Sequence, residues 1–356
     1  MKEYIVIKDI LNIRNRPSDK EDNSFVGQLL KGDTIWLDDA EITGDIPRNG
    51  LTNIWRALDN VRLVASDGVM EFTSLSKKEL LIKDLRTFWE KSRGSGISIA
   101  IMDTGIRFNP PGFTTTIETI FSSDHVPPID FHGTRMAGIL CGSKTNEMVG
   151  FAPDVKIMDY KFLNNDETNV NNNIIDALTA IAAKEEVNII NLSVEFDRGF
   201  FADFEIIALE ELFARILAQG KIIVAATGNN RSDLSASVKF PGTSENVITV
   251  GAIRNGKVIN FQNGIAMRDF TKNPDCFIEI DEWTLCNNNY SFESSTEINS
   301  SEVTAIMTSL ISLKMSIAKN LTQEDIKNQI KQSCSFFEKK DYLNVYKLNI
   351  SNFINL

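Results

Sequence analysis

The chain has 356 residues, of which 42% are hydrophobic and 24% are charged. This composition allows a sizeable hydrophobic core and excludes a wholly disordered or fibrous chain. The 48 acidic residues outnumber the 37 basic ones, so the net charge is −11. Such a charge argues against a nucleic-acid-binding protein that works by neutralising phosphates.

The first 74 residues contain short apolar runs separated by turn-forming residues. The runs lie at residues 4–7, 11–13, 25–30, 34–37, 55–58 and 62–65. Closely spaced short strands of this kind predict a small all-β barrel. Residues 11–18, 26–33 and 55–58 resemble a bacterial SH3-like domain, and that resemblance implies a module over residues 1–74 that binds a peptide or a protein partner.

Residues 75–93 are predicted to form a helical linker, because apolar residues recur at helical spacing between Leu80 and Leu85. Beyond it, continuous apolar runs are typical of strands that are covered on both faces; they lie at residues 97–102, 187–192, 222–226 and 247–253. Two segments between these runs, 174–182 and 209–217, have helical spacing. This alternation predicts an α/β domain over residues 94–356, with a doubly wound, mostly parallel sheet and flanking helices.

In a sheet of this kind, catalytic and ligand-binding residues lie at the carboxyl ends of the strands. Three polar residues of this chain are candidates for such positions. Asp103 ends a buried strand, where a carboxylate needs a partner. His132 is the obvious partner, and it is followed by small residues that suit a tightly packed helix. Asn229 follows another strand, where its amide can donate to a developing oxyanion.

The segments around Asp103, His132 and Asn229 resemble the Asp, His and oxyanion-Asn motifs of the subtilisin-like serine proteases, in that family's chain order. Further segments agree with the family, at residues 150–157, 188–193, 241–252 and 321–327. The resemblance covers residues 80–350 and implies a peptidase fold.

The position of the nucleophile departs from the family pattern. The family has a serine ahead of a long apolar helix, and an ungapped count back from the apolar residues 303–313 reaches Glu297. A carboxylate would give a reactive anhydride with a peptide, so we expect Glu297 to form a static pair with His132 instead. A gap in the count would make the nucleophile one of four nearby serines, Ser294, Ser295, Ser300 or Ser301.

A second departure lies where the family has glycines along the wall of the specificity pocket. This chain has Glu195 and Phe196 there, and we expect these larger side chains to narrow the substrate channel. The sequence thus predicts a catalytically inactive pseudoprotease that acts as a binding, scaffolding or regulatory protein with a protein or peptide partner. The alternative is an active serine endopeptidase with its serine at a non-standard position.

The sequence offers few residues that could bind a metal and no segment suited to a membrane. The chain has two histidines and no pair of cysteines two residues apart, so we expect no metal, no cofactor and no disulfide framework. The N-terminus lacks the apolar segment of a signal peptide, and no stretch is apolar enough to cross a bilayer. A cytoplasmic protein without membrane or nucleic-acid binding is expected, with four reduced thiols, those of Cys141, Cys276, Cys286 and Cys334.

Overall fold

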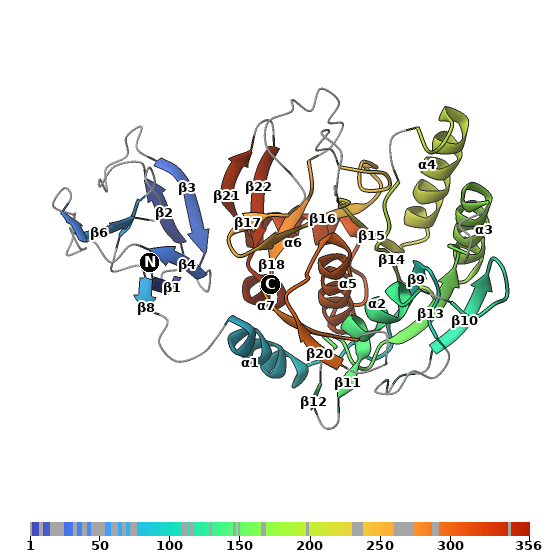
Figure 1. The fold of residues 1–356 in the computed structure, drawn as a ribbon, viewed down its shortest axis with the longest axis horizontal. Helices are drawn as coiled ribbons and strands as arrows, with labels where there is room; N and C mark the ends of the chain where they lie inside the picture. Colours follow the sequence, from blue (N-terminus) through green and yellow to red (C-terminus); the bar gives the residue numbers. More distant parts are fainter. Residues whose placement is uncertain are drawn as a thin grey trace. The chain divides into compact units, whose positions relative to one another are not determined.

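The chain divides into two compact units, Met1–Asp84 with Gln329–Leu356, and Leu85–Asn328. The structure is a computed structural model, drawn in Figure 1. It describes residues 2–6, 10–14, 25–30, 34–37, 41–43, 54–57, 63–65, 69–71, 77–107, 113, 115, 117–128, 130–144, 147–148, 150–164, 169–196, 199–229, 238–259, 273–286, 292–340 and 343–356.

The first unit consists mainly of short antiparallel strands. They are β1 (Lys2–Val6), β2 (Ile10–Arg14), β3 (Phe25–Leu30), β4 (Thr34–Leu37), β5 (Glu41–Thr43), β6 (Ile54–Ala57), β7 (Leu63–Ala65) and β8 (Val69–Glu71). Their order is β4-β1-β8 in one sheet and β3-β2-β7-β6-β5 in another. The strands lie close to the predicted apolar runs, while the SH3-like barrel stays a prediction.

The same unit also holds the C-terminal elements, an antiparallel pair of strands and a short helix. These are β21 (Cys334–Lys340), β22 (Leu343–Leu348) and α7 (Ile350–Asn355). Two helices run across the division of the chain, α1 (Lys77–Trp89) and α6 (Gln323–Ser333). The helix α1 falls within the predicted helical segment 75–93.

The second unit is built on a mostly parallel sheet with the strand order β10-β13-β9-β14-β15-β16-β18. Its strands are β9 (Ser98–Asp103), β10 (Ile117–Ser122), β13 (Lys156–Lys161), β14 (Ile189–Leu192), β15 (Ile222–Ala226), β16 (Ile248–Arg254) and β18 (Cys276–Glu279), with β17 (Lys257–Val258) antiparallel to β16. Four of these strands coincide with the predicted apolar runs. Two small hairpins lie outside the sheet, β11 (Ser143–Lys144) with β12 (Glu147–Met148), and β19 (Trp283–Cys286) with β20 (Phe292–Ser295).

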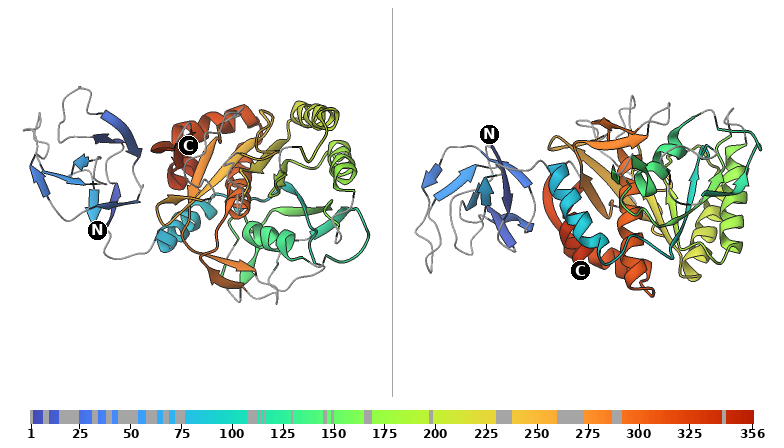
Figure 2. Two further views of the ribbon diagram at one scale, coloured as in Figure 1. Left: turned by 45° about the horizontal axis from the view of Figure 1, so that its top comes forward. Right: turned by 90° about the horizontal axis from the view of Figure 1, so that it is seen from below.

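Helices cover both faces of this sheet, as the continuous apolar runs predict. On one face, α3 (Val170–Ala183) and α4 (Asp203–Ala218) lie side by side (Figures 1 and 2) and pack on alternate strand residues such as Ala100 and Ile190. On the other face lie α2 (His132–Cys141), against β9, and α5 (Ser300–Ile317), against β14, β15 and β16. Ile99 and Ile101 are fully buried as well, so β9 is covered on both faces.

This arrangement brings polar residues together at the carboxyl ends of the central strands. Because β9, β14 and β15 are parallel neighbours, the segments that follow them leave the sheet at one edge. The first turns of α2 and α5 carry further polar residues, and the two helices contact each other. In the described part of the chain, no helix combines the length and apolarity needed to cross a membrane.

Candidate active site

Asp103 and His132 form a hydrogen-bonded pair at the end of β9. Both carboxylate oxygens of Asp103 lie 2.9 Å from Nδ1 of His132. The Asp103 side chain is completely buried, whereas the imidazole is 30% exposed. The backbone N–H of Thr104 donates to Asp103 Oδ1 at 2.7 Å, which satisfies part of the buried charge. The predicted pairing of these residues is present.

Gly133 lets the first turn of α2 approach the loop after β9. A Cβ atom at this position would lie 2.5 Å from the carbonyl oxygen of Gly105 and 3.2 Å from Cβ of Asp103. The backbone N–H of Gly133 donates to the hydroxyl of Thr104 at 3.1 Å. The small residue after His132 is therefore what allows the imidazole to reach the end of β9.

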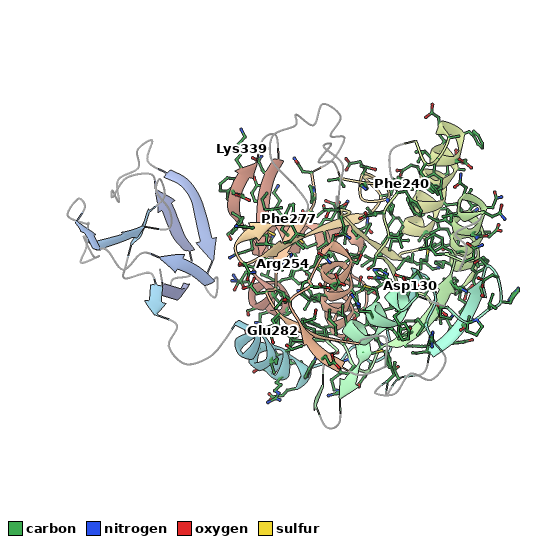
Figure 3. The ribbon with its side chains drawn as sticks, viewed as in Figure 1. Asp130, Phe240, Arg254, Phe277, Glu282 and Lys339 are labelled. Carbon is green, nitrogen blue, oxygen red and sulfur yellow. The ribbon has the colours of Figure 1, made fainter. Side chains whose placement is uncertain are left out.

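Three carboxylates raise the pKa of His132. Burial is the largest single influence and lowers this pKa, but the charge and hydrogen bonding of Asp103, together with the charges of Glu302 and Asp130, raise it by more in sum. The net effect is to raise the pKa of His132 from 6.5 to about 9, so the imidazole is protonated at neutral pH. Asp130 also accepts the backbone N–H of His132, and Figure 3 shows it beside α2.

Asn229 lies beside the first residue of α5. Its side-chain oxygen Oδ1 accepts a hydrogen bond from the backbone N–H of Ser300 at 3.2 Å and from the Ser300 hydroxyl at 2.9 Å. Ser300 is 1% exposed and starts α5, where the helix dipole favours negative charge. A serine hydroxyl, an amide and a helix N-terminus thus meet at the end of β15.

A network of buried hydrogen bonds ties α5 to the end of β14. Ser193 and Ser301 each donate the hydroxyl to the other's backbone carbonyl at 3.0 Å. About two turns further along α5, the hydroxyl of Thr308 donates to Oδ1 of Asn191 at 3.0 Å, and Nδ2 of Asn191 donates to the Ser193 hydroxyl at 2.9 Å. These contacts position the N-terminus of α5, and with it Ser300, against the sheet.

Arg135 and Glu302 connect the first turn of α2 with the first turn of α5. Their closest side-chain atoms, Nη1 of Arg135 and Oε1 of Glu302, are 3.5 Å apart, and the Glu302 side chain is 3% exposed. Oε2 of Glu302 accepts the backbone N–H of Asn299 at 2.9 Å and so caps α5. His132 and Arg135 are three residues apart on α2, so they share a helix face that is directed toward the start of α5.

Three segments meet next to Asn229. The carboxylate of Glu195 accepts the backbone N–H of Asn229, and its Oε1 lies 3.7 Å from Nζ of Lys239. The backbone N–H of Lys239 donates to the carbonyl of Thr227 at 3.0 Å. A charged pair from two loops therefore flanks the turn that carries the Asn229 amide.

Phe196 lies away from this charged pair, in the hydrophobic core. Its backbone N–H donates to the carbonyl of Phe240 at 2.8 Å, and its ring packs 5.0 Å from that of Phe201. The Phe240 ring lies near α4 (Figure 3), stacked on Phe213 at 6.0 Å. Of the two residues that we expected to narrow the channel, Glu195 is the one beside Asn229.

The structure brings Asp103 to His132 and Asn229 to Ser300, but it does not bring Glu297 to His132. Glu297 is exposed, and its backbone N–H donates to the hydroxyl of Ser295 at 3.1 Å. The acidic residue of α5 that acts on His132 is Glu302, which sequence reasoning missed. The signal for it is the spacing of Asn299 and Glu302, a helix-capping pattern that marks where α5 begins.

The chain belongs to the Subtilase family, whose model matches residues 94–346. It is similar to the subtilisin of Bacillus sp. (strain TA39), with 27% identity over 176 residues that cover 47% of this chain and 41% of that protein. It is also similar to the intracellular serine protease of Paenibacillus polymyxa, with 27% identity over 176 residues, 46% of this chain and 52% of that protein. The chain thus spans about half the length of these curated relatives.

Solved structures share the fold. The Prenylagaramide maturation protease PagA aligns with a TM-score of 0.58 and 23% identity, covering 76% of this chain and 98% of that one. A cold adapted subtilisin-like serine proteinase aligns with a TM-score of 0.55 and 17% identity, covering 72% and 89%. The predicted subtilisin-like α/β fold, with its mostly parallel sheet and flanking helices, is confirmed.

Proposed function

We propose that the chain is a subtilisin-like serine endopeptidase and that its nucleophile is Ser300. The observation that carries this proposal is the contact between Ser300 and Asn229, in which both the hydroxyl and the backbone N–H of the serine reach the amide. The ungapped count to Glu297 is then three residues short. The family membership of the chain and its similarity to a subtilisin and to an intracellular serine protease support the same activity.

In the proposed reaction, Oγ of Ser300 attacks the carbonyl carbon of a peptide bond while Nε2 of neutral His132 takes its proton. Asp103 holds Nδ1–H and stabilises the imidazolium that forms. The C–N bond breaks, and His132 returns the proton to the leaving amine. Water then attacks the acyl-enzyme with His132 again as base, which releases the acid and restores Ser300.

The oxyanion of this reaction has two donors at hand, the backbone N–H of Ser300 and the amide of Asn229. In the structure the Asn229 side chain presents Oδ1 to Ser300, so the backbone N–H and the hydroxyl of Ser300 both donate to Asn229. Turning the amide about its last side-chain bond presents Nδ2 and frees the Ser300 N–H. Both donors then face the developing charge, assisted by the N-terminus of α5.

The proposal is tested with a fluorophosphonate, which forms a covalent adduct with an activated serine. We expect the intact protein to gain the mass of one adduct and peptide mapping to find it on Ser300. Ser300→Ala should abolish the adduct, whereas Glu297→Gln and Ser294→Ala should retain it. An adduct on another serine, or none under conditions where an active subtilisin is fully modified, overturns the assignment.

A second candidate function is peptide binding without cleavage, as a pseudoprotease. The observation that favours it is the charged pair of Glu195 and Lys239, which lies beside Asn229. In this case the adduct experiment gives no modification of wild type, and peptides bind without being cut. A protein or peptide partner and a cytoplasmic location are part of both proposals.

A further inference from the structure

We infer that Glu195 and Lys239 fill the pocket for the residue that precedes the scissile bond, so that the substrates are peptides with glycine or alanine at that position. This inference rests on the proposed function. It concerns which peptides react, and it assigns specificity to two side chains that the reaction itself does not use.

The position of the reacting carbonyl follows from Ser300 and Asn229. The carbonyl carbon must come within roughly 3 Å of Ser300 Oγ, with its oxygen between the serine N–H and the Asn229 amide. The α-carbon of the same residue is one bond away from the carbonyl carbon. Its side chain therefore begins next to Asn229, against the preceding residue, Gly228.

The face of Gly228 is already occupied. A Cβ atom built on this glycine would lie 3.0 Å from Oε2 of Glu195, 3.1 Å from Cγ of Lys239 and 3.2 Å from its Cβ. These distances are shorter than ordinary van der Waals contact, so the two side chains take up the space on this face of Gly228. We therefore expect the hydrogen atom of glycine or the methyl group of alanine to disturb the pair least, whereas a larger side chain has to displace it.

Displacing Glu195 and Lys239 costs free energy, because hydrogen bonds and packing contacts hold both residues in place. Glu195 accepts the backbone N–H of Asn229, and moving it away leaves that amide to be satisfied otherwise. Its neighbour Phe196 is fixed in the core by the Phe240 carbonyl and the Phe201 ring, so the backbone of Glu195 cannot retreat. Lys239 is held at the other side by its backbone bond to Thr227 and by the ion pair.

The pair also disfavours charged substrate side chains. An acidic substrate side chain in the pocket would be attracted by Lys239 but repelled by the carboxylate of Glu195. A basic side chain would be attracted by Glu195 but repelled by Lys239. Each has to break the existing ion pair to gain a new one, so neither gains much. Glycine and alanine leave the pair intact.

The test is a set of peptides that differ only in the residue before the scissile bond, namely Gly, Ala, Leu, Phe, Asp and Lys. We expect wild type to cleave the Gly and Ala peptides with kcat/KM values on the order of tenfold to a hundredfold above the others. The double variant Glu195→Gly/Lys239→Gly, with an emptied pocket, should gain on Leu and Phe. Glu195→Gln keeps the volume and should keep the Gly and Ala preference.

A matched control removes an ion pair elsewhere: Glu118 lies 2.9 Å from Lys156 on the surface, and Glu118→Gln should leave the peptide profile unchanged. A wild type that prefers Leu, Phe, Asp or Lys overturns the inference even where Ser300 is modified by the fluorophosphonate. If wild type cleaves nothing and the double variant cleaves the Leu or Phe peptides, the filled pocket is supported. If Ser300 is not modified in either protein, the proposed function itself is wrong, and this inference falls with it.

Discussion

The hydroxyls of Ser193 and Ser301 each donate to the other residue's backbone carbonyl, at 3.0 Å in both directions. Ser193 directly follows β14 and Ser301 is the second residue of α5, so this exchange joins two elements that are 108 residues apart in the sequence. Both side chains are buried. The exchange places the neighbouring Ser300 at a defined position relative to the sheet.

Removing one partner of this exchange should destabilise the protein. Ser301→Ala leaves the carbonyl of Ser193 without its hydroxyl donor, and we expect the free energy of unfolding to fall by about 1–3 kcal/mol. Urea unfolding followed by fluorescence measures this. Thr179→Ala, on the exposed face of α3, should change stability by no more than about 0.5 kcal/mol. Equal effects of the two variants would contradict the role of the exchange.

The modification of Ser300 should be slow at neutral pH and accelerate as the pH rises toward about 9. The reason is that the proposed reaction uses the neutral imidazole as its base, and the neighbouring carboxylates raise the pKa of His132 to about 9. Glu302→Gln removes one of these negative charges while it keeps an acceptor for the Asn299 N–H. The pKa of His132 should fall, and the pH profile of fluorophosphonate labelling should move to lower pH.

Glu297→Gln is the matched control for this profile, because it removes the same charge from the exposed segment just before α5. We expect its labelling profile to superimpose on that of wild type. A shift with Glu297→Gln and none with Glu302→Gln would support the original assignment of Glu297 as the neighbour of His132. NMR titration of the His132 ring provides the same comparison without any reaction.

Asp159, on β13, should make the protein less stable as the pH rises. Burial raises the pKa of Asp159 most, the charge of Asp103 adds to the rise, and the Ile106 N–H, the Thr119 hydroxyl and Lys161 lower it, so that the pKa is raised from 3.8 to about 7 in total. The folded state therefore holds this proton more tightly than the unfolded state does. Its contribution is fully present below about pH 4 and is lost as the pH rises through about 7.

Asp159→Asn, which resembles the protonated acid, should therefore be more stable than wild type above pH 7, by roughly 1–3 kcal/mol. Oδ1 of Asp159 is buried without a hydrogen-bond partner among the described residues, and the substitution breaks no contact that they make with this atom. Denaturant unfolding at pH 4 and pH 8 measures the difference, which should nearly vanish at pH 4. A variant that loses stability at pH 8 would refute the prediction.

Gly133→Ala should separate α2 from the loop after β9. The added methyl group would lie 2.5 Å from the Gly105 carbonyl, so one of the two segments has to move. We expect the unfolding free energy to fall by about 1–3 kcal/mol and labelling of Ser300 to be lost, because the imidazole no longer meets Asp103. Wild-type stability together with wild-type labelling would show that this close approach is not required.

The sequence by itself determined four strands of the parallel sheet and three of the residues at its edge. Continuous apolar runs mark strands buried on both faces, and β9, β14, β15 and β16 lie where those runs are. Asp103, His132 and Asn229 were identified because each directly follows, or lies close to, such a local pattern. Such local patterns can be recognised without knowing the fold, because strand and helix periodicity depend only on neighbours in the chain.

Only the tertiary structure decided which residues of α5, β14 and the loop before Phe240 accompany these three. The segment between β20 and α5 has no periodicity, so a count through it cannot distinguish Glu297 from Ser300, and our proposal of Ser300 rests on its contact with Asn229. Glu195 and Lys239 are 44 residues apart and meet only because β14 and β15 are adjacent strands whose following segments fold toward each other. Such meetings depend on loop paths and packing, which the local chain pattern does not encode.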